Sequence, residues 1–137
     1  MKLKRTLFTL LFTAATVSTA HAVIVYTHVL LAVANQTSST NGAGIPLQAR
    51  EGACAGRLAA TINSGTSPTL DVTIQYSIDN ATWFNLLSFT QVTSGTSNQI
   101  VHYDSTLTRQ YPWVRAVATL GGTSPNVTAS VFFDCED

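Results

Sequence analysis

Few residues of this chain have the types and spacing that catalysis requires. Beyond the first 22 residues only two histidines remain, His28 in an apolar segment and His102 beside Asp104. A relay of Ser105, His102 and Asp104 is excluded, because residues so close on one strand point to different faces of a sheet. The sequence contains no nucleophile elbow, phosphate-binding loop or HExxH motif. It therefore predicts a protein that is not an enzyme.

No metal or cofactor is expected either. The C-terminal acids Asp134, Glu136 and Asp137 offer the oxygen ligands that Ca²⁺ prefers, but a solvated acidic C-terminus is the ordinary arrangement. Cys54 and Cys135 lack the neighbouring histidines that a four-ligand zinc site needs. An even number of cysteines in an exported chain instead predicts a disulfide. This bridge would close a loop of about 80 residues and stabilise the fold by about 4–5 kcal/mol.

Aromatic residues provide the chemistry for one possible ligand. Sandwich proteins often present Trp and Tyr to sugars, which makes Tyr103, Tyr111 and Trp113 candidate glycan contacts. The alternative is that Trp83, after a predicted hairpin turn, and Trp113, at the start of a strand, fill the core, where large rings stabilise a small domain strongly. We favour the core position for both rings, and glycan binding stays open.

The N-terminus predicts export. Three basic residues precede an apolar stretch at residues 7–17, and Ala20-His21-Ala22 supplies the small-x-small pattern of a signal-peptidase site. The apolar stretch is shorter than the roughly 20 residues that a helix needs to cross a bilayer. We therefore expect residues 1–22 to be a cleaved signal peptide, a secreted, extracellular or periplasmic location, and no integral membrane segment after cleavage.

The composition of the remaining chain limits its architecture and its partners. Removing 22 of the 137 residues leaves 115, which suits a single domain, residues 23–137, with one modest core. This domain has four arginines and no lysine against seven acidic residues. A negative balance argues against nucleic acid as a partner. The lack of lysine removes a residue that usually protects sheet edges, so self-association is less strongly opposed.

Alternation of apolar and polar residues predicts an all-β fold. It is clear at residues 71–78, which the turn Asp79-Asn80 joins to a return strand, so that residues 71–88 are expected to form a hairpin. Residues 114–120 and 127–133 alternate in the same way, and Gly121-Gly122 should end the first of them. We predict a single antiparallel β-sandwich of seven or eight short strands, either immunoglobulin-like or jelly-roll.

A short repeat also stands out. The tetrapeptide GTSP occurs at residues 65–68 and again at 122–125, each time before a predicted strand. Two copies of one turn do not by themselves indicate a repeat architecture.

The apolar segment at residues 23–34 predicts a strand with two possible partners. We favour the first, in which it is the opening strand of the chain's own sandwich. In the second it completes the sheet of a neighbouring subunit by strand donation, with five apolar residues as the donor set: Val23, Ile24, Val25, Val29 and Leu31.

The sequences of several predicted strands and turns resemble those of a known class of proteins. GTSPTLDVTIQYS (65–77), FTQVT (89–93) and VRAVATLGGTSP (114–125), preceded by NGAGIPL (41–47), resemble small β-sandwich structural proteins of tailed bacteriophages. The resemblance implies a non-catalytic subunit that packs on a capsid or tail surface. The signal peptide and the cysteine pair depart from it, because virion proteins normally assemble in the cytoplasm.

Two functions from different classes follow. The first is an exported, non-catalytic structural subunit of a cell-surface or extracellular assembly, such as a filament, a layer or a particle, with further copies of the chain as partners. The alternative is a secreted or periplasmic ligand-binding module, with carbohydrate as the expected ligand.

Overall fold

The computed structural model describes residues 25–47, 53–103 and 112–136. In these ranges the chain forms seven β-strands and no helix, and every strand pair is antiparallel. The all-β prediction is confirmed, whereas residues 1–22 lie outside the described part. The strands are β1 (Val25–Gln36), β2 (Thr40–Asn41), β3 (Ile45–Pro46), β4 (Cys54–Ser77), β5 (Phe84–Ser88), β6 (Thr96–Tyr103) and β7 (Trp113–Glu136). Since no helix occurs there, no helical segment of the described ranges could cross a membrane.

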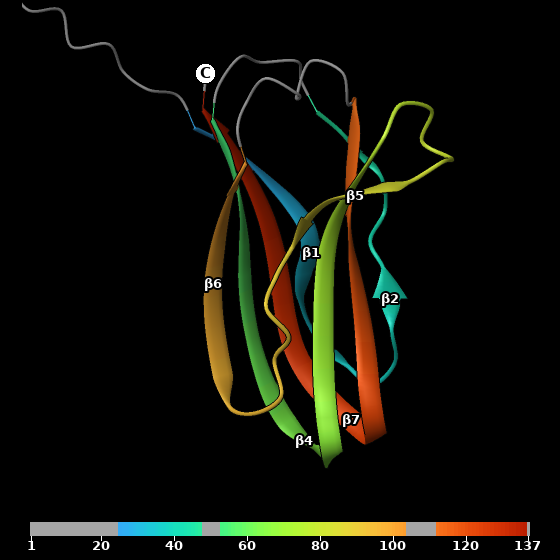
Figure 1. Cartoon of the computed structure of the whole chain (residues 1–137), viewed down its shortest axis with the longest axis vertical. Coiled ribbons are helices and arrows are strands. Elements are labelled where there is room, and N and C mark those ends of the chain that lie inside the picture. Colours follow the sequence, from blue (N-terminus) through green and yellow to red (C-terminus); the bar gives the residue numbers. More distant parts are fainter. Residues whose placement is uncertain (1–24, 48–52, 104–111, 137) are drawn as a thin grey trace, which may run out of the picture.

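The two longest strands, β4 and β7, lie side by side, and both bend sharply at the same end of the molecule (Figure 1). Residues 54–62 of β4 pair with residues 127–135 of β7, flanked by β6 and β1, and this part is called layer 1. Residues 70–77 of β4 pair with residues 113–120 of β7, flanked by β5 and by β2 and β3, and this part is called layer 2. One hydrogen-bonded sheet thus folds into a two-layered sandwich.

The core lies between the layers and is built from alternate side chains of β4 and β7. Residues of both layers belong to one buried cluster, to which layer 1 contributes Leu58 and Phe133 and layer 2 contributes Ile74. Gly56 allows the layers to approach, since a Cβ there would lie 2.8 Å from Cδ1 of Ile74. The alternation predicted for the last strand is confirmed by four fully buried residues: Val127, Ala129, Val131 and Phe133.

The two GTSP segments are the corners at which β4 and β7 pass from one layer to the other. Thr66 pairs with Thr123, the same position in the other copy. Both copies have positive φ angles at the glycine and the serine: Gly65 132°, Ser67 47°, Gly122 89° and Ser124 50°. A local two-fold axis at the threonine pair therefore relates the two corners. The sequence predicts turns that end separate strands here, but the structure has two continuous strands of 24 residues that bend.

The two-fold relation extends over the whole sandwich. β1 pairs with the C-terminal half of β7, and β5 likewise pairs with the C-terminal half of β4. β2 and β3 pair with the N-terminal half of β7, and β6 likewise pairs with the N-terminal half of β4. The order β1, β2–β3, β4 thus matches the order β5, β6, β7. RLAATI (57–62) before the first GTSP also resembles RAVATL (115–120) before the second. The repeated turn belongs to two halves of similar structure.

The hairpin predicted for residues 71–88 is confirmed, since β5 pairs with the end of β4. The Asp79 carboxylate accepts hydrogen bonds from the backbone N–H groups of Ala81 (2.9 Å) and Thr82 (2.7 Å), and these bonds lower its pKa. One detail differs from the predicted alternation, because Ser77 is buried and Ile78 is exposed. The strand ends at Ser77, whose hydroxyl donates to the Asp79 carboxylate instead of facing solvent.

A disulfide joins Cys54 and Cys135, as the cysteine count predicts. The two residues stand opposite each other on β4 and β7, with their Cα atoms 4.2 Å apart. Both are buried. The bond therefore fastens the start of β4 to the end of β7, at the end of layer 1 away from the corners.

Candidate functional site

A row of side chains crosses the outer face of layer 1. Val29 on β1 pairs with Phe132 on β7, Phe132 pairs with Arg57 on β4, and Arg57 pairs with Ile100 on β6. Directly paired residues place their side chains on the same face of a sheet, so these four form one line, here called the layer 1 row. Val29 is 47% and Ile100 62% exposed. Three of the four members are therefore apolar on a face that no described element covers.

Arg57 links the layer 1 row to the neighbouring row, in which Asp134 on β7 pairs with Ala55 on β4. Its guanidinium carbon lies 5.1 Å from the centre of the Phe132 ring. Its Nε donates to Oδ2 of Asp134 and its Nη2 donates to Oδ1 at 3.2 Å. These contacts with the carboxylate raise the pKa of Arg57. A two-point contact with Asp134 holds the long side chain along the face instead of leaving it in water.

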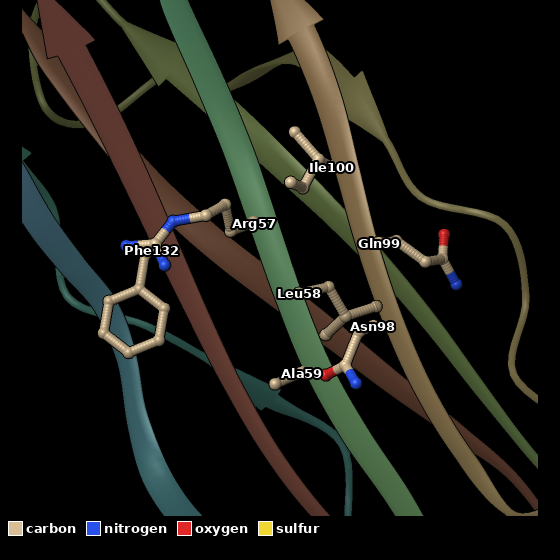
Figure 2. A pocket seen from close by; sticks show the side chains of 7 residues that line it. All are labelled: Arg57, Leu58, Ala59, Asn98, Gln99, Ile100 and Phe132. Atoms are coloured by element: carbon tan, nitrogen blue, oxygen red, sulfur yellow. The ribbon is translucent and has the colours of Figure 1, made fainter.

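The face is hollowed beside β4 and β6. The hollow has a volume of about 260 Å³ and is lined by Arg57, Leu58, Ala59, Asn98, Gln99, Ile100 and Phe132. Figure 2 shows Arg57 extending from β4 towards Phe132 on β7, with Ile100 on β6. The lining contains no carboxylate, imidazole or thiol that could transfer a proton or attack a substrate. In the described ranges, moreover, no group of three or more His, Cys, Asp or Glu residues could hold a metal ion.

The equivalent row on layer 2 has a different character. Arg115, the counterpart of Arg57 in the second half, donates from Nε and Nη2 to Oε1 of Gln75 at 2.9 and 2.8 Å. Gln75 in turn donates to Oδ1 of Asn85 at 3.0 Å. The guanidinium carbon of Arg115 also lies 4.3 Å from the centre of the Trp83 ring. The layer 2 row is therefore a hydrogen-bonded chain of polar side chains, whereas Arg57 has apolar neighbours on both sides of its row.

The tryptophans do not fill the core, so that prediction is wrong. Trp83 and Trp113 are both half-buried and lie outside the buried cluster. Trp83 packs beneath Arg115, and its ring is so close to Gly44 that a Cβ there would lie 3.0 Å from it. The turn after β4 places this ring on the outer face of layer 2, where a cation covers it.

The three candidate glycan contacts do not form one surface in the described structure. Trp113 lies in layer 2, on the opposite side of β7 from the fully buried Val114. Tyr103 lies in layer 1 and packs against the core. Tyr111 falls outside the described residues. Two aromatic residues in different layers do not provide the flat platform on which a sugar ring stacks.

β1 pairs with β7 of the same chain from Val25 opposite Glu136 to Gln36 opposite Val127, with two register shifts between Val29 and Ala34. This is the first of the two arrangements predicted for the segment, and Leu30, 3% exposed, anchors it in the core. Val25 and Val29 of the donor set are exposed and Leu31 is half-buried, whereas Val23 and Ile24 lie outside the described residues.

The histidines lie apart. His28 is half-buried on β1, and burial lowers its pKa against a smaller opposing effect of Asp134. His102 is exposed on β6, while Asp104 and Ser105 fall outside the described residues.

The residues of the layer 1 row were not predicted from the sequence, apart from Val29 as a donor residue. Arg57, Ile100 and Phe132 are far apart in the chain, and only strand pairing brings them together. The one local signal is Phe132 itself, a large ring at a polar position of the alternating segment 127–133.

Comparisons with known proteins identify the fold. No family model and no curated protein matches the chain. Three solved structures are similar: infectious bursal disease virus Gx strain (TM-score 0.55, 14% identity, 89% of this chain and 35% of that chain), the T13 particle of the same virus (0.54, 14%, 82% and 31%) and the exported protein XepA of PBSX (0.50, 15%, 80% and 36%). The chain thus spans about a third of each neighbour. The predicted likeness to phage structural proteins is confirmed at the level of the fold, in a viral particle protein and a phage exported protein.

Proposed function

We propose that this protein is an exported, non-catalytic structural subunit that assembles through the outer face of layer 1. The observation that carries the proposal is the layer 1 row, in which Val29, Phe132 and Ile100 present apolar surface around a single arginine. Aromatic and arginine side chains are enriched at protein interfaces, where they supply much of the binding energy. The hollow beside Ile100 offers a place for a partner's side chain.

Two further observations support a structural role. The fold is shared with proteins whose structures are described as a viral particle and as an exported protein of PBSX. The lining of the hollow lacks the groups that chemistry would need. An assembly subunit requires a rigid scaffold and a contact surface; the disulfide-bonded sandwich and the layer 1 row are the features that support these two roles.

Export is supported by the disulfide. Buried cystine is typical of proteins that mature in an oxidising compartment, and Cys54–Cys135 spans 81 residues of sequence. Residues 1–22 would direct the chain there, with cleavage after Ala22.

The proposal is tested on the full chain expressed for export and purified without reductant. N-terminal sequencing should place the mature start at Val23, and sizing with negative-stain microscopy should reveal oligomers or particles whose amount rises with concentration. A monomer at every concentration up to about 1 mM, the limit of weak association, would overturn the structural role, and glycan binding by such a monomer would favour the ligand-binding alternative.

A matched pair of variants identifies the surface. Ile100 and Ile78 are similarly exposed, 62% and 66%, but only Ile100 belongs to the layer 1 row. I100S should weaken assembly at least tenfold, whereas I78S should leave it unchanged. Equal effects of the two changes would show that the contact does not depend on layer 1.

Strand donation is the other form that the assembly could take. It requires β1 to leave its own sheet and replace the β1 of a neighbour, carrying Leu30 into the neighbour's core. Deletion of residues 23–34 separates the two forms. If the shortened chain is unfolded while the intact protein is strictly monomeric, donation is wrong.

A further inference from the structure

We propose that the layer 1 face binds a second copy of itself, in a two-fold arrangement that sets Arg57 of each copy against Asp134 of the other. The inference rests on the proposed function and names the partner. It starts from four residues at the centre of the face. Arg57 and Ala55 lie on β4, directly opposite Phe132 and Asp134 on β7.

These four side chains stand at the corners of a rectangle, because paired strands lie about 4.8 Å apart and alternate residues about 6.8 Å apart. The two charges, Arg57 and Asp134, occupy one diagonal, and Phe132 and Ala55 occupy the other. A two-fold axis that lies in the face, through the centre of the rectangle and perpendicular to the charged diagonal, exchanges the two charged corners and passes close to Phe132 and Ala55. The patch is then its own complement, which a two-fold interface between identical subunits requires.

The surroundings of the rectangle favour this partner over one of different charge. The positions beside the rectangle, in its two rows and in the adjoining row of Ala59, hold no Asp, Glu, Lys or Arg: they are Thr27, Val29, Ala59, Asn98, Ile100, His102 and Ser130. Arg57 and Asp134 already pair within one copy, so a partner with one net charge would be attracted by one member of the pair and repelled by the other. A second copy presents the same ion pair in the reverse direction, so that each guanidinium lies beside the carboxylates of both copies and the two Phe132 rings lie close together.

The size of the face indicates how strong a single contact is. Four strands about 19 Å wide and eight residues about 26 Å long give about 500 Å² for each copy, or about 1,000 Å² in total. This area is at the lower end for specific interfaces. A single pair is therefore weak, and the contact gains strength by repetition in an assembly.

Charge reversal tests the arrangement directly. In R57E both charged corners of the face become acidic, and in D134R both become basic. Each variant alone should associate at least tenfold more weakly than the wild type in sedimentation velocity, because like charges then face each other across the axis. An equimolar mixture should regain association as mixed pairs, because an acidic face meets a basic one. Circular dichroism and thermal unfolding would establish that each variant is folded.

The opposite layer supplies the control. R115E and D71R make the same charge changes on the outer face of layer 2, and neither these variants nor their mixture should differ from the wild type in association. If the wild type associates but the R57E and D134R mixture gains nothing over either variant, the arrangement is wrong while the structural function stands. If the wild type never associates, the proposed function itself fails.

Discussion

At the two GTSP corners β4 and β7 pass together from one layer to the other, and the close contact between these corners leads to a prediction for Gly122. Its φ angle is +89°, and a Cβ at this position would lie 2.4 Å from the carbonyl oxygen of Ser67 and 2.7 Å from that of Thr66. Both atoms belong to the backbone of the facing corner. They cannot rotate away as the end of a side chain could, so the alanine in G122A must push the two corners apart.

The magnitude of the effect follows from two contributions. A positive φ costs alanine about 1–2 kcal/mol relative to glycine, and overpacking against a fixed neighbour adds about 1–3 kcal/mol. We therefore expect G122A to lower the free energy of unfolding by about 3 kcal/mol. Gly95 is the matched control, because its φ is +61° and a Cβ there would meet nothing within 4 Å. G95A should cost only about 1 kcal/mol, the backbone contribution alone.

Guanidinium unfolding of the oxidised protein measures both losses, with the fluorescence of Trp83 and Trp113 as the signal. The slope of the transition should be unchanged in both variants, so that the midpoints report stability. Equal losses for G122A and G95A would refute the reasoning, since they would show that the contact between the corners has no energetic effect.

Three further predictions concern pH and the disulfide. Because burial lowers the pKa of His28 in the folded chain, the melting temperature should fall as the pH drops below about 6.5. H28Q should lose that part of the pH dependence. If the melting temperature of H28Q depends on pH as steeply as that of the wild type, His28 is not the cause. The turn bonds lower the pKa of Asp79, so its contribution is present above about pH 4 and is lost in more acidic solution. D79N should therefore be less stable than the wild type at pH 7 and closer to it at pH 2, and a constant difference would count against this. Replacing both cysteines, C54A with C135A, should lower the free energy of unfolding by about 4 kcal/mol, and a loss below about 1 kcal/mol in the same guanidinium titration would show that the paired strands need no bridge.

Much of the fold could be predicted from the sequence, because a strand with one face in the core shows period-two alternation. Residues 127–133 follow that rule, and all four of their predicted inward residues are fully buried. The continuity of β4 and β7 could not be predicted. Gly-Thr-Ser-Pro normally indicates the end of a strand, and only the pairing of Thr66 with Thr123 shows that two such segments support each other.

The positions of the tryptophans were wrong for a related reason. Large rings are often placed in the core, but in this sandwich the space between the layers is filled by Phe133, Phe89 and smaller apolar residues, most of them from β4 and β7. Val114 already points inward at the start of β7, so the pleat sends Trp113 to the other face. Composition alone does not reveal which of two neighbours faces inward.

The similarity of the two halves gives the strongest argument for the place of the proposed contact. Arg57 and Arg115 occupy corresponding positions, and in each case the facing residue comes from the partner strand of the β4–β7 pair. Around Arg115 those neighbours are Gln75 and Asn85, joined by hydrogen bonds, whereas around Arg57 they are Phe132 and Val29.

Because the backbone arrangement is the same, the fold cannot account for this difference in chemistry. A face in contact with water gains from polar groups that satisfy one another, as in layer 2. Apolar residues at the same positions gain only when another surface removes them from water. The contrast between the rows of Arg57 and Arg115 therefore supports the proposal that subunits meet at layer 1 while layer 2 faces solvent. The comparison of I100S with I78S tests that proposal.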